Sequence, residues 1–245
     1  RDLHSFPTRR SSDLNRSEGA RHMNPAGQVP VRWIFESESS KRMPCGSPEV
    51  WTVHLDDPLV LAQARTVLSP EEEASARRFA TVTLGDRYAA AHGALRILLG
   101  RWLGRDPREV RFFRNVCGKP FVEGGPYFSL SHAEGLAAVA IFPDREVGVD
   151  IERVRPFPAM ADIAEQFFSS GERAWIAGGV PPESRFFRCW VLREAFVKAL
   201  GEGLSFPLDR FCIRPPDDRG GDGVSLILKD GDSPDVDLTE WHPNG

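Results

Sequence analysis

The alternation of apolar and acidic residues from Gly148 to Glu152 is the pattern that most limits how this chain can fold. Residues two apart on a strand face the same side, so we expect Asp150 and Glu152 to project together while Val149 and Ile151 face a core. Two carboxylates aimed at one point repel each other unless a cation or a proton joins them. Magnesium is a hard cation that takes oxygen ligands and shares them with phosphates. The segment therefore indicates either a metal-binding strand or a strand edge with solvated acids.

A second polar pattern lies on a helix that we expect over residues 183–200. Trp190, Glu194 and Lys198 recur every four residues and therefore share one helical face. One interpretation is an ion pair worth only ~0.2–0.5 kcal/mol beside a core tryptophan. The other is a third carboxylate for a metal, together with an ammonium group that offsets phosphate charge.

A third pattern combines a turn with the strand that follows it. Lys119 stands between Gly118 and Pro120, and Ser131 and His132 end a short strand that begins at Phe128. Hydroxyl, imidazole and ammonium groups are donors that suit phosphate oxygens. A histidine at the end of a strand also serves as a structural hydrogen-bonding residue, so this pattern alone leaves both interpretations open.

Charge and composition exclude several classes of protein. The chain of 245 residues has a net charge of −4, which argues against a nucleic-acid partner. Its four cysteines are scattered without a CxxC pair, so neither a disulfide framework nor a zinc site is expected. No apolar run approaches the roughly 20 residues of a membrane span, and the start lacks the apolar stretch of a secretory signal. We expect a soluble, cytoplasmic, monomeric protein without membrane contact.

Three regions follow from the order of turn and helix signals. Residues 1–45 are rich in Ser, Arg, Pro and Gly, so we expect a disordered or non-native segment there, and residues 1–22 are left out of the fold prediction. We expect an N-terminal lobe over 46–144 and a C-terminal lobe over 145–245 that carries the metal and catalytic residues. Helix starts are expected at Ser69-Pro70, after Gly85, near residue 159, at Ser169 and at residue 183. Strands are expected over 49–55, 128–131, 136–142, 147–151, 211–213 and 224–229.

Taken together and in order, these motifs resemble the surfactin-type branch of the 4'-phosphopantetheinyl transferases. The shared blocks span roughly residues 51 to 224. They are Ser69-Pro70-Glu71 with Arg77-Arg78-Phe79, Gly118-Lys119-Pro120, Phe128-Ser129-Leu130-Ser131-His132, Gly148-Val149-Asp150-Ile151-Glu152, Phe167-Phe168-Ser169, Trp190-x-x-Arg193-Glu194-Ala195-Phe196-x-Lys198, Gly201-Glu202-Gly203-Leu204-Ser205 and Pro207-Leu208.

The resemblance implies an α+β fold of two similar lobes related by a pseudo-twofold axis, with coenzyme A in the cleft between them. It implies transfer of 4'-phosphopantetheine from coenzyme A to a serine of an apo acyl or peptidyl carrier protein, a holo-acyl-carrier-protein synthase type of reaction used in secondary metabolite biosynthesis. Magnesium, with manganese as a substitute, would be the cofactor. The implied metal ligands are Asp150, Glu152 and Glu194; the implied catalytic residues are Glu194, Lys198 and Asp150; the implied coenzyme A contacts are Lys119, Ser131, His132, Arg87, Tyr88 and Lys198.

Two departures from the family pattern affect this reading. Arg193 stands where the family often has lysine, which puts a proton-shuttling role in doubt. Glu72 and Ser75 stand where lysines of well-known members meet the 3'-phosphate, which leaves that contact weaker or supplied by Arg77, Arg78 or Arg87. Two alternative functions are a magnesium-dependent nucleotide phosphohydrolase that uses the same acids and a non-catalytic coenzyme A binding module.

Overall fold

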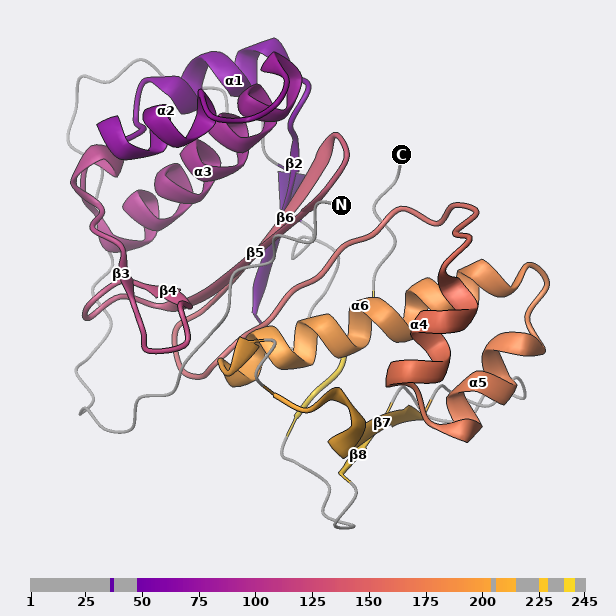
Figure 1. Ribbon diagram of the computed structural model, residues 1–245. Helices are drawn as coiled ribbons and strands as arrows, with labels where there is room; N and C mark the ends of the chain where they lie inside the picture. The colour runs from indigo at the N-terminus through magenta and orange to yellow at the C-terminus, as the bar shows by residue number, and fades with distance from the viewer. Residues whose placement is uncertain (1–35, 38–47, 204–205, 215–224, 229–235, 241–245) are drawn as a thin grey trace.

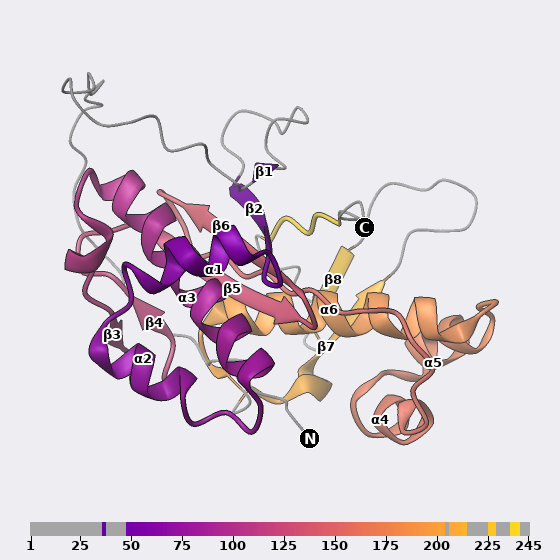
Figure 2. The same ribbon diagram turned by 90° about the horizontal axis from the view of Figure 1, so that it is seen from above.

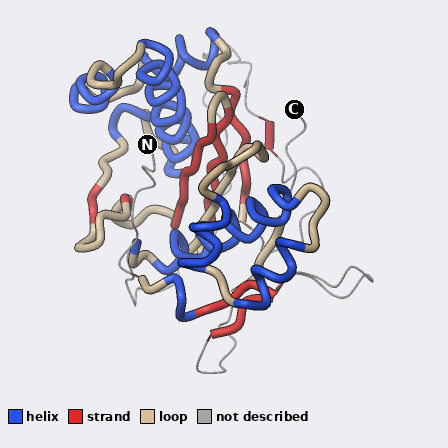
Figure 3. The backbone as a smooth tube through the Cα atoms, turned by 45° about the vertical axis from the view of Figure 1, so that its right-hand side comes forward, coloured by secondary structure: helices blue, strands red, loops and turns tan. Residues whose placement is uncertain are grey.

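A computed structural model describes residues 36–37, 48–203, 206–214, 225–228 and 236–240. It is a mixed α+β structure, as predicted, in which helices lie on both sides of an antiparallel sheet (Figures 1 and 3). The sheet has the strand order β1 (Glu36–Ser37), β2 (Glu49–His54), β6 (Leu136–Phe142) and β5 (Tyr127–Ala133). None of the helices within the described residues is both long and apolar enough to cross a membrane.

Three helices cover one face of this sheet (Figure 1). They are α1 (Pro58–Arg65), α2 (Pro70–Ala76) and α3 (Val82–Leu103). Strand β6 divides its side chains by the two-residue period: Val139 and Ile141 join the core under the helices, whereas Ala138 and Ala140 face the opposite side. That opposite side packs against Val147 and Val149, so the segment after β6 lies on the sheet.

The second half of the chain is built around one long helix, α6 (Pro182–Leu200). Helices α4 (Met160–Phe167) and α5 (Ser170–Ala177) pack on its N-terminal part through an aromatic cluster. Strands β7 (Phe211–Arg214) and β8 (Ser225–Leu228) pack on its C-terminal part, beyond the sheet of the first half (Figure 2). Short connections complete the fold: η2 (Pro107–Glu109), β3 (Phe113–Arg114), β4 (Pro120–Phe121) and η4 (Leu208–Arg210).

A capping box tied to a buried arginine occurs once in each half. Ser69 and Glu72 cap α2 reciprocally, and Arg96 of α3 donates to the same Glu72 carboxylate at 2.6 Å. In the second half Glu172 completes the cap of α5 and accepts from Arg193 of α6 at 2.7 and 2.8 Å. Each arginine also donates to the carbonyl of the first residue of a 3-10 helix and to that of the residue after the helix. These are Pro107 and Val110 in one half and Leu208 and Phe211 in the other. Both halves thus fix a helix start to a long helix by the same device.

Most expected elements are present, and four differences have clear physical causes. Residues 147–151 do not form a strand, because the Val149 N–H donates to the Ser129 hydroxyl at 3.1 Å instead of joining a ladder. Helix α3 begins at Val82 rather than after Gly85, since Thr81 caps it, and helix α1 was not predicted. Residues 36–37 pair with β2 although they lie within the segment 1–45 that was expected to be disordered or non-native; the remainder of 1–45 lies outside the described residues.

Glycine permits close backbone packing at two of the predicted motifs. A Cβ atom at Gly85 would lie 2.4 Å from the carbonyl oxygen of Ala76, so α2 ends directly against α3. A Cβ atom at Gly148 would lie 1.9 Å from the carbonyl oxygen of Ala195 and 2.5 Å from the amide nitrogen of Ala199. The segment that carries Asp150 therefore touches the backbone of α6 directly.

Candidate functional site

Three motifs that are distant in sequence meet at the carboxylate of Asp150. The Lys198 ammonium of α6 donates to Asp150 Oδ1 at 2.5 Å, and both side chains are only 5% exposed. The Ser131 hydroxyl of β5 donates to the same oxygen at 2.7 Å and accepts from Lys198 Nζ at 2.9 Å. A strand of the sheet, the segment after β6 and helix α6 thus contribute one group each to a buried polar cluster.

Two further carboxylates lie close enough to Asp150 to feel its charge. Burial first, and then Asp150, raises the pKa of Glu152 to about 7. Burial first, and then the charge of Asp150, also raise the pKa of the buried Glu194, and the charge of Lys198 opposes this rise. Glu194 contributes to the shift of Glu152 as well. The three acids predicted to act together therefore interact electrostatically, although residues 147–151 do not form the strand from which their common direction was inferred.

The cluster offers the carboxylate oxygens that a divalent cation binds, but its side chains are not arranged around a common cation position. Asp150 Oδ2 is buried and has no hydrogen-bond partner among the described residues, which is costly for a carboxylate oxygen unless a ligand satisfies it. Asp150 raises the pKa values of Glu152 and Glu194, and carboxylates gathered in this way suit a hard cation. Within the described residues, however, no group of three or more His, Cys, Asp or Glu side chains is gathered closely enough to hold a metal ion, and Lys198 is the cation on Asp150. The residues fit magnesium by their chemistry, and the ligand set stays a prediction.

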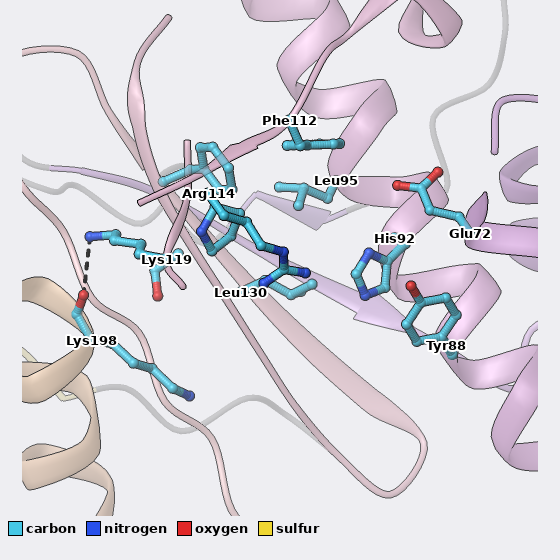
Figure 4. A pocket seen from close by; sticks show the side chains of 12 residues that line it. Glu72, Tyr88, His92, Leu95, Phe112, Arg114, Lys119, Leu130 and Lys198 are labelled. Atoms are coloured by element: carbon cyan, nitrogen blue, oxygen red, sulfur yellow. Dashed lines mark hydrogen bonds between the residues drawn. The ribbon is translucent and has the colours of Figure 1, made fainter. Parts of the chain in front are cut away.

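A cavity of about 120 Å³ opens beside this cluster (Figure 4). Its wall combines apolar and aromatic side chains with three basic residues, of which Lys198 comes from the second half of the chain. The lining residues are Glu72, Tyr88, His92, Leu95, Phe112, Arg114, Lys119, Pro120, Phe128, Ser129, Leu130 and Lys198. Aromatic rings together with basic side chains suit a ligand that combines a flat ring with phosphates.

The predicted coenzyme A contacts are placed differently from one another. Tyr88 lines the cavity and stacks on His92 with ring centroids 4.0 Å apart. Arg87, one residue earlier, donates twice to Asp56 at 2.7 Å. His132 lies near the end of β5 and is exposed to solvent as a residue. Partial loss of hydration of its ring, and then the charge of Lys198, lower its pKa. The cofactor contacts predicted for Arg87 and His132 therefore stay predictions.

Two cavity residues carry polar chemistry that the sequence analysis did not identify. Arg114 follows the aromatic pair Phe112-Phe113 in β3, and Figure 4 shows its side chain among those that line the cavity. His92 is partly buried, and loss of hydration, with the charges of His132 and Arg114 next, lowers its pKa to about 3. The sequence signal was that Arg114 lies four residues before the turn at Gly118-Lys119. The residues of that turn did not show whether Arg114 lines a cavity or lies on the surface.

Arg193, the first departure from the family pattern, lies outside the polar cluster. Its side chain is 1% exposed, pairs with Glu172 and stacks on Phe168 and Phe211. The second departure has a similar cause, since Glu72 is occupied by the cap of α2 and by Arg96. Both residues hold helices in place. In the described structure neither points its charge at Asp150.

The buried lysine–carboxylate cluster and the basic residues of the cavity have the donor chemistry that phosphate esters require. Residues 146–242 match the model of the 4'-phosphopantetheinyl transferase superfamily. The chain is 36% identical over 165 residues to the 4'-phosphopantetheinyl transferase HetI of a Nostoc species, covering 64% of this chain and 69% of the relative. It is 30% identical over 193 residues to the 4'-phosphopantetheinyl transferase Sfp of Bacillus subtilis, covering 76% and 84%. A further 4'-phosphopantetheinyl transferase of Bacillus subtilis is 31% identical over the same shares. The chain belongs to the 4'-phosphopantetheinyl transferase superfamily.

Proposed function

We propose that this protein transfers the 4'-phosphopantetheine group of coenzyme A to a serine of an apo acyl or peptidyl carrier protein, in a reaction of the holo-acyl-carrier-protein synthase type. The products are the holo carrier protein and 3',5'-ADP. The observation that carries the proposal is the meeting of Ser131, Asp150 and Lys198, from three separate motifs, in one buried cluster beside the cavity. Membership of the superfamily supports the same reaction.

The reaction forms one phosphorus–oxygen bond and breaks another. The carrier serine oxygen attacks the phosphorus that bears pantetheine, and the bond from that phosphorus to the oxygen of the departing 3',5'-ADP breaks. Glu194 accepts the serine proton, directly or through a water molecule. Lys198 exchanges Asp150 for a pyrophosphate oxygen and offsets the charge that develops on the leaving group.

Asp150, Glu152 and Glu194 would hold magnesium, or manganese in its place. The ion, when bound, neutralises pyrophosphate charge. The unsatisfied Asp150 Oδ2 supports this assignment, because it is the buried oxygen that a cation would complete. We further propose that residues 46–144 form the lobe that contacts the nucleotide, that residues 145–245 form the lobe that carries the metal and catalytic residues, and that the two are related by a pseudo-twofold axis. We also propose that the protein is a monomer and lies in the cytoplasm.

The test is incubation of the purified protein with coenzyme A, magnesium and an apo carrier protein, followed by intact-mass analysis of the carrier. One phosphopantetheine should be added, EDTA should prevent the addition, and excess magnesium should restore it. Asp150→Asn should lower turnover by orders of magnitude, whereas Asp144→Asn, a change of the same kind at an exposed site, should leave it unchanged.

Each alternative function gives its own result in this experiment. Release of a nucleotide from coenzyme A without a carrier protein would indicate a phosphohydrolase. Binding of coenzyme A with no modification of any carrier would indicate a binding module. Near-normal transfer by Asp150→Asn would contradict the role assigned to the cluster.

A further inference from the structure

The ammonium group of Lys119 faces protein oxygens rather than the open cavity. It donates to Glu146 Oε2 at 2.6 Å and to the carbonyl oxygens of Lys198 at 3.0 Å, Val147 at 3.4 Å and Ala199 at 3.5 Å. The side chain is 6% exposed. Figure 4 shows it extended toward the backbone of Lys198, while the Lys198 side chain runs in another direction. Four oxygens therefore surround a group that has three protons to donate.

Two of the three carbonyls that Lys119 contacts, those of Lys198 and Ala199, belong to the end of a helix. Helix α6 ends at Leu200, and Gly201 in the left-handed conformation (φ 90°) closes it with a bond from its N–H to the Val197 carbonyl. The last carbonyls of a helix lack partners within the helix and carry partial negative charge. Lys119 supplies a positive donor to two of them from another part of the chain.

The turn that presents Lys119 is itself rigid. The Asn115 side chain accepts from the backbone N–H groups of Cys117 at 2.6 Å and of Lys119 at 3.1 Å. The Asn115 N–H donates to the Lys119 carbonyl at 3.1 Å, and Gly118 adopts a φ of 90° that favours glycine. The backbone of Lys119 is thus fixed before its side chain reaches α6.

We propose that Lys119 is a positioning residue that holds the C-terminal end of α6 and the 146–147 segment against the first half of the chain. The inference rests on the proposed function, because the residue that it holds, Lys198, also supplies the ammonium group at Asp150. Because Lys119 fixes the position of the C-terminal backbone of α6, it determines where Lys198 and Glu194 lie relative to Asp150. This differs from the coenzyme A contact that the family resemblance implies, in which the ammonium group would face a phosphate.

The experiment separates turnover from ligand affinity. Lys119→Met removes the charge while keeping side-chain length, Lys119→Arg keeps a donor of similar reach, and Glu146→Gln weakens the clamp at a residue that does not line the cavity. Arg111→Met removes an exposed cation from the same region as a matched control. For each variant, kcat and the KM for coenzyme A are measured with a carrier protein, and the Kd of 3',5'-ADP is measured by calorimetry.

A positioning role has a distinct outcome. Lys119→Met and Glu146→Gln should both lower kcat, the former by about 10²-fold as for a misplacement of ~1 Å. The KM for coenzyme A and the Kd of 3',5'-ADP should stay within about twofold of the original, and Lys119→Arg should recover part of kcat. If Lys119→Met does not fold, Glu146→Gln carries the test alone.

Three outcomes would overturn the inference. They are a rise of tenfold or more in KM and Kd at unchanged kcat for Lys119→Met, an unchanged kcat for Glu146→Gln, or an equal loss of kcat in Arg111→Met. Absence of transfer by the unmodified protein is a different result, since it contradicts the proposed function and leaves the ADP affinities to report on whether Lys119 contacts the nucleotide.

Discussion

Replacing Gly148 by alanine should separate the Asp150 segment from α6 and thereby disable the site without removing any polar group. The added Cβ atom would lie 1.9 Å from the Ala195 carbonyl oxygen, whereas ordinary contact begins at 3.4 Å. A displacement of about 1.5 Å, the difference between these distances, would relieve the clash completely. A shift of ~1 Å at a reacting centre costs about 10²-fold in rate. Whether the segment or the helix yields, the relation of Asp150 to Glu194 changes.

The assay compares initial rates of carrier modification and free energies of unfolding in urea. We expect kcat to fall about 10²-fold and stability to fall by ~1–3 kcal/mol, the usual cost of overpacking. Gly171→Ala is the matched control, because a Cβ atom in α5 would meet only the Ser169 hydroxyl at 4.0 Å. That variant should keep its kcat and its stability or gain ~0.5–1 kcal/mol. A Gly148→Ala enzyme with kcat within twofold of the original would refute the reasoning.

Three other perturbations test separate parts of the structure. Arg193→Met should cost ~3–5 kcal/mol in urea unfolding because it leaves the Glu172 carboxylate buried without its cation, while turnover per folded molecule persists; a cost below ~1 kcal/mol would contradict this. His92 has a pKa of about 3 in the folded protein, so the unfolded chain binds a proton at this residue first as the pH falls below ~6.5. The free energy of unfolding should therefore fall by up to ~2 kcal/mol between pH 6.5 and 5. His92→Gln should flatten that part of the pH profile. Arg114 is a cavity-lining cation, and we expect it to contact the 3'-phosphate in place of the absent lysines. Arg114→Gln should then raise the KM for coenzyme A about tenfold, equivalent to ~1.4 kcal/mol, yet leave the KM for 3'-dephospho-coenzyme A within twofold; equal effects on both substrates would exclude this contact.

Local rules were sufficient wherever an element is stabilised by its own sequence. The capping residues Ser69 and Ser169 each lie three residues before a glutamate, and both helices start where this pattern predicts. Strand β2 likewise follows from its alternation. Residues 147–151 have the same alternation and form no strand, because the hydroxyl of Ser129 takes the N–H that a neighbouring strand would need. No property of the segment itself could reveal that competitor.

The site was predictable in its residue types and not in its orientations. The alternation at Asp150 and Glu152 and the four-residue spacing of Glu194 and Lys198 indicated three acids and a cation with phosphate chemistry. The structure pairs Lys198 with Asp150, and the charge of Asp150 acts on Glu152 and Glu194. The direction of Lys119 depends on carbonyl oxygens about 80 residues further along the chain, so the motif Gly118-Lys119-Pro120 predicts a lysine at the site without saying whether it faces ligand or protein.

Helix α6 is the element on which the separate parts of the site depend. Its backbone meets Gly148 on one side and the Lys119 ammonium at its end, and its side chains supply Glu194 and Lys198 to the cluster. In the proposed reaction the Lys198 side chain leaves Asp150 for a pyrophosphate oxygen, and a fixed Lys198 backbone keeps Glu194 in place during that exchange. A lysine that holds that backbone through its carbonyl, independently of the side chain, provides this fixed position. The two lysines therefore divide the task, since one fixes the helix and the other is left able to exchange a carboxylate for a phosphate.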